Sequence, residues 1–144
     1  MNGRFTMLCT LLGAVWSAVI GALGGWDKAI VSLIIFMAID FAMGLICAIF
    51  FGKSDKSKNG GLSSSACWKG IAKKVCTLAM VIVAHRLDML IGTDYVRNAV
   101  IFGFCTAEII SICETAVLME VLPPEIQNIF VKALDVLKGK SEKK

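Results

Sequence analysis

Four long apolar segments, separated by short polar stretches, make up most of this 144-residue chain. They cover residues 5–26, 29–52, 71–92 and 98–122. A helix of about 20 apolar residues crosses the roughly 30 Å hydrocarbon core of a bilayer, and each segment reaches that length. The pattern therefore predicts an all-α integral membrane protein with about four transmembrane helices.

The third segment is the least apolar of the four. Lys73 and Lys74 lie near its start, and only residues 75–84 are free of charge. A run of that length alone is too short to span a bilayer, but residues 71–92 as a helix would extend about 33 Å. We therefore count it as a span. At its far end, Arg86 has two open interpretations: it extends to the outer interface, or it neutralises a carboxylate of a neighbouring helix.

A fifth, amphipathic segment follows the last span, which Pro123 and Pro124 are expected to end. Apolar residues recur there at helical spacing, opposite charged and amide side chains: Ile126, Ile129, Phe130, Ala133, Leu134 and Leu137. Such a helix lies in the membrane interface or packs on a partner. The organisation is thus a transmembrane domain over residues 1–122, with a basic loop at 53–70, followed by an amphipathic helix and a lysine-rich tail at 123–144. We expect the tail to be disordered and close to anionic lipid.

Several carboxylates lie inside the apolar segments, where a charge costs about 2.5–3.5 kcal/mol on insertion scales. Asp40 is near the middle of its segment, while Glu108 and Glu114 share a polar stripe with Ser111. The candidate polar and oligomerisation residues of the membrane region are Asp40, Gly44, Arg86, Asp88, Glu108, Ser111 and Glu114. Two roles remain open for the carboxylates: a proton relay, or polar contacts that hold an oligomer together.

The first segment is uncharged and carries a small residue at every fourth position. Gly13, Ser17, Gly21 and Gly25 would form one face on which helix backbones approach closely in lipid. Small residues are also simply common in membrane helices, which is the alternative interpretation. A cleaved signal peptide is a further alternative, but the basic region before the segment is thin and no convincing cleavage site follows.

The distribution of charge supports a membrane location. The chain is 57% hydrophobic and only 18% charged, whereas soluble domains are about a quarter charged. With both termini in the cytoplasm, 12 of the 15 lysines and arginines lie on the cytoplasmic side, and Lys28 and Arg97 lie outside. This asymmetry is typical of a multi-pass protein of the cytoplasmic membrane. Because no basic stripe is interleaved with aromatic residues, we do not expect nucleic-acid binding.

Residues for catalysis or metal binding are scarce. The six cysteines form no C-x-x-C pair, so packing is the favoured interpretation, with disulfides or a zinc site as alternatives. His85 is the single histidine, and although Asp88 lies one turn away, no plausible nucleophile accompanies the pair. We therefore expect no enzymatic activity, no cofactor and no metal site.

The order of several short motifs resembles a known family. The motifs are D-x-x-x-G at Asp40 and Gly44 followed by Ala48, serines at 63–65, a basic helix entry at Gly70, Lys73 and Lys74, an aspartate at Asp88, E-x-x-S-I-x-E from Glu108 to Glu114, and a proline turn from Pro123. Over about residues 28–138 the chain resembles the toxin-secretion/phage-lysis holins, small membrane proteins of phages and prophages. Two positions depart from the pattern. Thr115 replaces an asparagine, and a glycine before the prolines is replaced within residues 119–122.

The resemblance implies a protein that oligomerises in the cytoplasmic membrane of the host and opens lesions that dissipate the membrane potential. The lesions release an endolysin or, in some members, a toxin, so the expected partners are copies of the chain, membrane lipid and an exported protein without stable direct contact. Two other classes stay open: a small transporter or ion-channel subunit that uses the membrane carboxylates, and a membrane scaffold whose tail recruits a soluble partner.

Overall fold

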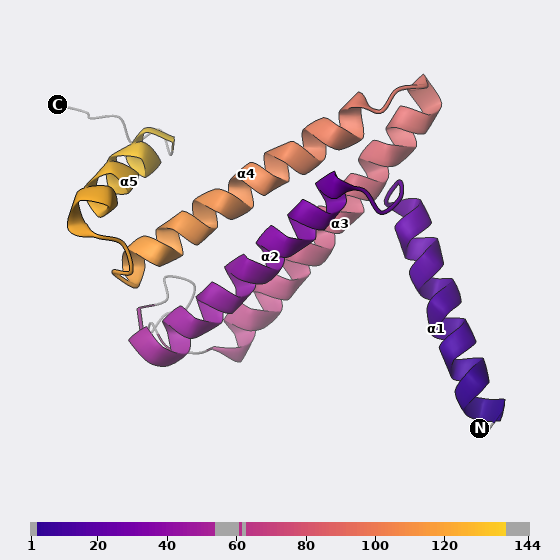
Figure 1. Cartoon of the computed structure of the whole chain (residues 1–144), viewed down its shortest axis with the longest axis horizontal. Coiled ribbons are helices and arrows are strands. Elements are labelled where there is room, and N and C mark those ends of the chain that lie inside the picture. The colour runs from indigo at the N-terminus through magenta and orange to yellow at the C-terminus, as the bar shows by residue number, and fades with distance from the viewer. Residues whose placement is uncertain (1–2, 54–60, 62, 138–144) are drawn as a thin grey trace.

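The computed structural model describes residues 3–53, 61 and 63–137, and all the regular structure among these residues is helical (Figure 1). The elements are α1 (Gly3–Ala22), α2 (Lys28–Ile46) continued by the π-helical turn η1 (Cys47–Phe51), α3 (Ser64–Ile91), α4 (Tyr95–Leu118) and α5 (Pro124–Leu137). The predicted all-α class is confirmed. Three helices of the described chain are long and apolar enough to cross a membrane: α1, α2 with η1, and α4.

Helix α3 is the predicted span that does not meet this description. It has 28 residues, about 42 Å of helix, but it carries Lys69, Lys73 and Lys74 in its first half. It also begins at Ser64, seven residues before the predicted segment, because no glycine or proline interrupts residues 64–69 and the extended backbone of Ser63 starts the helix there. The predicted loop 53–70 is therefore shorter, and its residues 54–60 and 62 lie outside the described residues.

Helices α2, α3 and α4 form a bundle in which α3 runs antiparallel to the other two (Figure 1). Its core consists of buried apolar side chains from all three helices and from the turn before α2: Leu23, Ile30, Leu33, Met37, Val81 and Ile101. In a membrane, helices associate through close van der Waals packing and polar contacts, since lipid chains are as apolar as the side chains. The bundle is therefore the unit that positions the polar residues described below.

Helix α1 projects away from the bundle and has no buried residue (Figure 1). It ends at Ala22 because Gly24 and Gly25 both have positive φ, +86° and +100°. The Gly24 and Gly25 amides donate to Gly21 O and Ile20 O, which closes the helix as a Schellman motif. Gly25 therefore lies beyond the helix, and the predicted small-residue face is wrong at that position. Gly13, Ser17 and Gly21 remain on α1 and are exposed.

Helix α4 ends at Leu118, four residues before the predicted boundary and before either proline. The Glu120 amide donates to Val117 O and the Val121 amide to Ala116 O, with Glu120 at φ +55°. This is again a Schellman motif, but with glutamate at the left-handed position that usually holds glycine. The helix thus stops by its own capping, and Pro123 and Pro124 lead into α5, where Pro124 suits the first helical turn.

Helix α5 occupies the segment that the amphipathic pattern marks, and Ile126 and Ile129 on its apolar side are exposed. It lies at the end of the bundle where α2 leads into α3 (Figure 1). The predicted disordered tail falls on residues 138–144, which lie outside the described residues.

Candidate functional site

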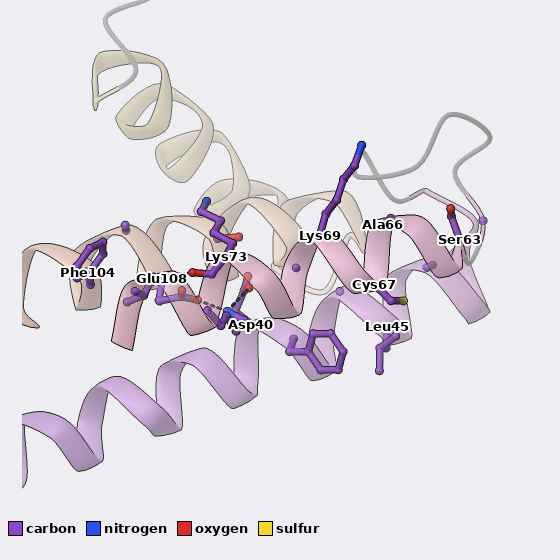
Figure 2. A pocket seen from close by; sticks show the side chains of 18 residues that line it. Asp40, Leu45, Ser63, Ala66, Cys67, Lys69, Lys73, Phe104 and Glu108 are labelled. Atoms are coloured by element: carbon purple, nitrogen blue, oxygen red, sulfur yellow. Dashed lines mark hydrogen bonds and ion pairs between the residues drawn. The ribbon is translucent and has the colours of Figure 1, made fainter. Parts of the chain in front are cut away.

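Three charged side chains, one from each helix of the bundle, meet between α2, α3 and α4. The Lys74 Nζ lies 2.9 Å from Asp40 Oδ2 and 2.7 Å from Glu108 Oε2. Figure 2 shows Asp40 and Glu108 close to each other, with dashed lines for the contacts of this site. We call Lys74, Asp40 and Glu108 the ion triad. It connects all three helices through charge-assisted hydrogen bonds, which are about twice as strong as neutral ones.

The ion triad lies far from the ends of its helices. Lys74 is about 15 Å from the start of α3, and Glu108 is about 15 Å from the end of α4. The side chains of Lys74, Asp40 and Glu108 are only 17%, 8% and 12% exposed. Removing one partner of a buried ion pair costs about 3–5 kcal/mol because it leaves a buried charge uncompensated. The triad therefore makes the three helices depend on one another.

A pocket of about 420 Å³ leads from one end of the bundle to the ion triad. Gly61 and Ser63 line it near the start of α3, and its inner part is lined by the triad together with Thr77 and Ser111. Apolar side chains form much of the wall between these ends: Phe41, Leu45, Ala48, Ala66, Cys67, Phe104 and Ala107. Figure 2 shows several of these residues around the pocket. The polar residues are thus reached through a mostly apolar opening.

A second polar cluster fixes the opposite end of the bundle. Asp88, near the end of α3, is buried, and its carboxylate accepts hydrogen bonds from the backbone amides of Val96 (3.0 Å) and Arg97 (2.7 Å) and from the Thr93 hydroxyl (2.7 Å). These amides belong to the first turn of α4, where helix N–H groups have no intrahelical acceptor. Asp88 therefore caps α4 within its own chain.

Arg97 joins this cluster to the start of the bundle. Its Nε donates to Leu23 O and its guanidinium lies 2.6 Å from Asp27 Oδ2, while the arginine side chain is 8% exposed. Asp27 also accepts from the Ile30 amide and so caps α2. The Arg97 hydrogen bond, aided by the Ile30 amide, holds the pKa of Asp27 below its usual value. Gly24 packs on the same side, where an added Cβ would lie 2.7 Å from both Arg97 Nε and His85 Nδ1.

The structure brings together four of the predicted polar residues, since Asp40, Gly44, Glu108 and Ser111 all line the pocket. Glu114 lies further along α4 and is half-buried. Arg86 and Asp88 belong to the other end of the bundle. Arg86 is exposed, with its guanidinium 3.8 Å from the Met89 sulfur. It therefore does not neutralise Asp40 or Glu108, whose cation is Lys74.

The two cations that hold the bundle were not singled out from the sequence. The sequence pattern places Lys74 at the start of the third span, on the cytoplasmic side, and Arg97 outside, just before the fourth span. The sequence contains only an indirect sign of Lys74. Charged residues within membrane segments usually pair with one another, so Asp40 and Glu108 require a cation at their own depth.

Comparison with known proteins finds relatives over most of the chain. The sequence profile of the bacteriophage holin family matches residues 17–139. An uncharacterised protein of Listeria monocytogenes is 33% identical over 92% of this chain and 87% of its own length, and one of Listeria innocua is 34% identical over the same shares. An uncharacterised 14.9 kDa protein from the nagH 3′ region of Clostridium perfringens is 33% identical over 79% of this chain and 80% of its own. No solved structure matches. The chain belongs to the bacteriophage holin family.

Proposed function

We propose that this protein is a holin: it accumulates in the cytoplasmic membrane, associates with copies of itself and opens lesions that depolarise the membrane. The lesions release an endolysin or a toxin, which passes without forming a stable contact, and no enzymatic step is involved. The observation that carries the proposal, beside membership of the family, is the ion triad at membrane depth. Charged side chains in a membrane either pair inside a bundle or face a water-filled cavity. The same residues can therefore stabilise a closed bundle and line an open lesion.

The proposal includes four membrane spans with both termini in the cytoplasm. Helices α2 and α4 are candidate spans that run in the same direction, and α3 connects the end of α2 to the start of α4 (Figure 1). If both cross the bilayer, the chain must return through it between them, and α3 is the segment that does so. Lys74, the lysine of α3 at the depth of Asp40, is compatible with this path because Asp40 and Glu108 neutralise it.

The change from bundle to lesion follows from the same contacts. In the closed bundle the polar stripe of α4, with Glu108, Ser111 and Glu114, is half-buried, and Glu108 and Ser111 line the pocket. Association of several copies would offer these groups either new polar partners or a shared water-filled opening. Helix α1, which is free of the bundle, supplies an apolar surface for association without disturbing the triad.

A second candidate function is that of a small channel or transporter subunit that moves a cation or proton through the carboxylates. One observation favours it: the pocket connects one end of the bundle with Asp40 and Glu108. The two functions differ in what crosses the membrane, since a channel passes small ions whereas a holin lesion passes a folded enzyme.

Inducible expression in a bacterium, with and without a cytoplasmic endolysin, tests the proposal. Membrane potential and culture density are followed together, with the protein level in the membrane as control. The proposal predicts sudden depolarisation at a reproducible time and rapid lysis only when endolysin is present. Depolarisation without endolysin-dependent lysis would favour the channel. An intact potential with normal membrane levels would contradict both.

A further inference from the structure

We propose that the pocket between α2, α3 and α4 is a binding site for an anionic phospholipid of the cytoplasmic leaflet, with one acyl chain against the apolar wall and the phosphate at Lys69 and Lys73. The inference concerns the resting protein and does not require that it open a lesion. It uses the proposed orientation, in which the start of α3 is cytoplasmic.

The first argument is the shape and lining of the pocket. Its volume of about 420 Å³ lies within the range of small-molecule sites, which are mostly apolar with a few placed polar groups. Small residues on two helices, Gly44 and Ala48 on one side and Ala66 and Gly70 on the other, leave the space open. Phe41 and Leu45 supply an apolar surface for a hydrocarbon chain. The ion triad at the inner end is internally paired and does not need a ligand.

The second argument is charge. Lys69 and Lys73 line the pocket from one face of α3, four residues apart, and both are exposed. Figure 2 shows the Lys69 side chain extending away from the helices, at a point on α3 between Ser63 and Lys73. Among the described residues, no carboxylate forms an ion pair with either ammonium. Basic pockets between membrane helices on the cytoplasmic side bind anionic headgroups, so the charge complements a phosphodiester.

The third argument is depth. Trp68 is 70% exposed and lies beside Lys69, and tryptophan is enriched at the level of lipid headgroups. Lys73 is one helical turn deeper, within reach of the same headgroup through its flexible stem. Of the apolar lining residues, Ala66 and Cys67 lie nearer the start of α3 than these lysines, and Phe41 lies at the level of Gly70, beside them. An acyl chain of a lipid held at Lys69 would therefore run alongside the lysines, against this wall.

Native mass spectrometry of the full chain, released from vesicles of phosphatidylcholine with or without phosphatidylglycerol, tests the site. The unmodified protein should retain phosphatidylglycerol in preference to phosphatidylcholine. Lys69→Gln with Lys73→Gln should reduce that retention about 30-fold, since each lysine near a membrane surface contributes about 1 kcal/mol. Ala66→Phe, which fills the pocket, should reduce it as well, whereas Lys28→Gln and Ala42→Phe, at exposed positions outside the pocket, should not.

Helicity and thermal unfolding of each variant show whether it is folded, and Ala66→Phe provides a test that leaves both lysines in place. Equal retention by all variants, or equal loss in Lys28→Gln and the double lysine variant, would overturn the proposal, because binding would then be a general surface attraction. Reaction of the pocket residue Cys67 with a maleimide provides a further test. If Cys67 in lipid-free protein is protected from the maleimide only when the protein is dimeric, the occupant is a second copy and the proposal is overturned.

Discussion

At the scale of single residues, Lys74 is the side chain on which the bundle depends most. Replacing it by methionine removes the ammonium that Asp40 and Glu108 share. We predict that Lys74→Met lowers the free energy of unfolding by about 3–5 kcal/mol, as expected when a buried ion pair loses one partner. Unfolding in a denaturing detergent titration measures it, with Lys132→Met on exposed α5 as control. A loss no larger than that of the control would show that the triad is not formed.

A triple variant separates the contribution of the charges from that of their pairing. Lys74→Met combined with Asp40→Leu and Glu108→Leu removes all three charges and keeps apolar volume. Such replacements of buried ion pairs are often neutral or stabilising. Most of the stability lost in Lys74→Met should therefore return in the triple variant. Its permeabilisation of membranes should stay below that of the unmodified protein, if the charges serve the open state.

Glu120 is the described non-glycine residue with a left-handed backbone, at φ +55°. It is held by an exposed ion pair with Lys53 Nζ, 2.6 Å away, which also lowers the pKa of Glu120. We predict that Glu120→Gly is more stable than Glu120→Ala by about 1 kcal/mol, because both lose the ion pair and only alanine keeps the left-handed strain. Thermal unfolding of the two variants side by side measures the difference. Equal stability would mean that the helix does not end in this conformation.

The residue scale is also where the sequence was least informative. The hydropathy pattern places Asp40 and Glu108 inside apolar segments but cannot distinguish Lys73 from Lys74, which point about 100° apart on a helix. Only the packing of α3 against both neighbours directs Lys74 inward. Arg97 was missed for a similar reason, since a cation next to a span normally marks an interface, whereas here the Leu23 carbonyl and Asp27 hold it inside.

At the scale of elements, hydropathy and helical period predicted the helices well and their ends less well. The ends of α1 and α4 are set by Schellman motifs at Gly24 and Glu120, not by the last apolar residue or the first proline. The start of α3 was placed too late because the polar residues 64–70 suggested a loop. Hydropathy alone also understates α3, because two of its charged residues, Lys74 and Asp88, are paired or hydrogen-bonded with neighbouring elements.

Whether α3 crosses the membrane is a prediction with a direct test. We expect its two ends to lie on opposite sides, so that a cysteine at Gly61 is labelled from the cytoplasm and one at Asp94 from outside. A membrane-impermeant maleimide on intact cells and on inverted vesicles, in a variant without the six native cysteines, measures this. Labelling of both positions from the same side would contradict a spanning α3 and reduce the number of spans.

Helix α1 carries the second prediction at this scale. Gly21 is exposed, and an added Cβ there meets nothing within 4 Å in its own chain. Gly21→Leu should therefore leave the monomer folded but weaken association between copies, because leucine prevents close approach of helix backbones. Cross-linking in membranes measures the effect, with Val19→Leu elsewhere on exposed α1 as control. Unchanged cross-linking of Gly21→Leu would count against α1 as the association surface.

At the scale of the whole molecule, the proposed function makes the bundle with its ion triad the closed state, whose stability would set when lesions form. Asp40→Asn and Glu108→Gln each weaken the triad while leaving hydrogen-bonding groups in place. We predict that both variants change the time or extent of depolarisation more than they change the amount of protein in the membrane. Normal levels of the variants in the membrane, with an unchanged time of depolarisation, would show that the triad does not control permeabilisation.

The most direct test of the account is release of cargo from vesicles that contain only the purified protein. Vesicles are loaded with a small fluorescent dye and a folded, labelled protein of endolysin size, and both are followed as the protein-to-lipid ratio rises. The account predicts release of both cargoes above a threshold ratio, at a threshold that Asp40→Asn and Glu108→Gln shift. Release of the dye alone at every ratio would contradict it and assign the protein to ion conduction.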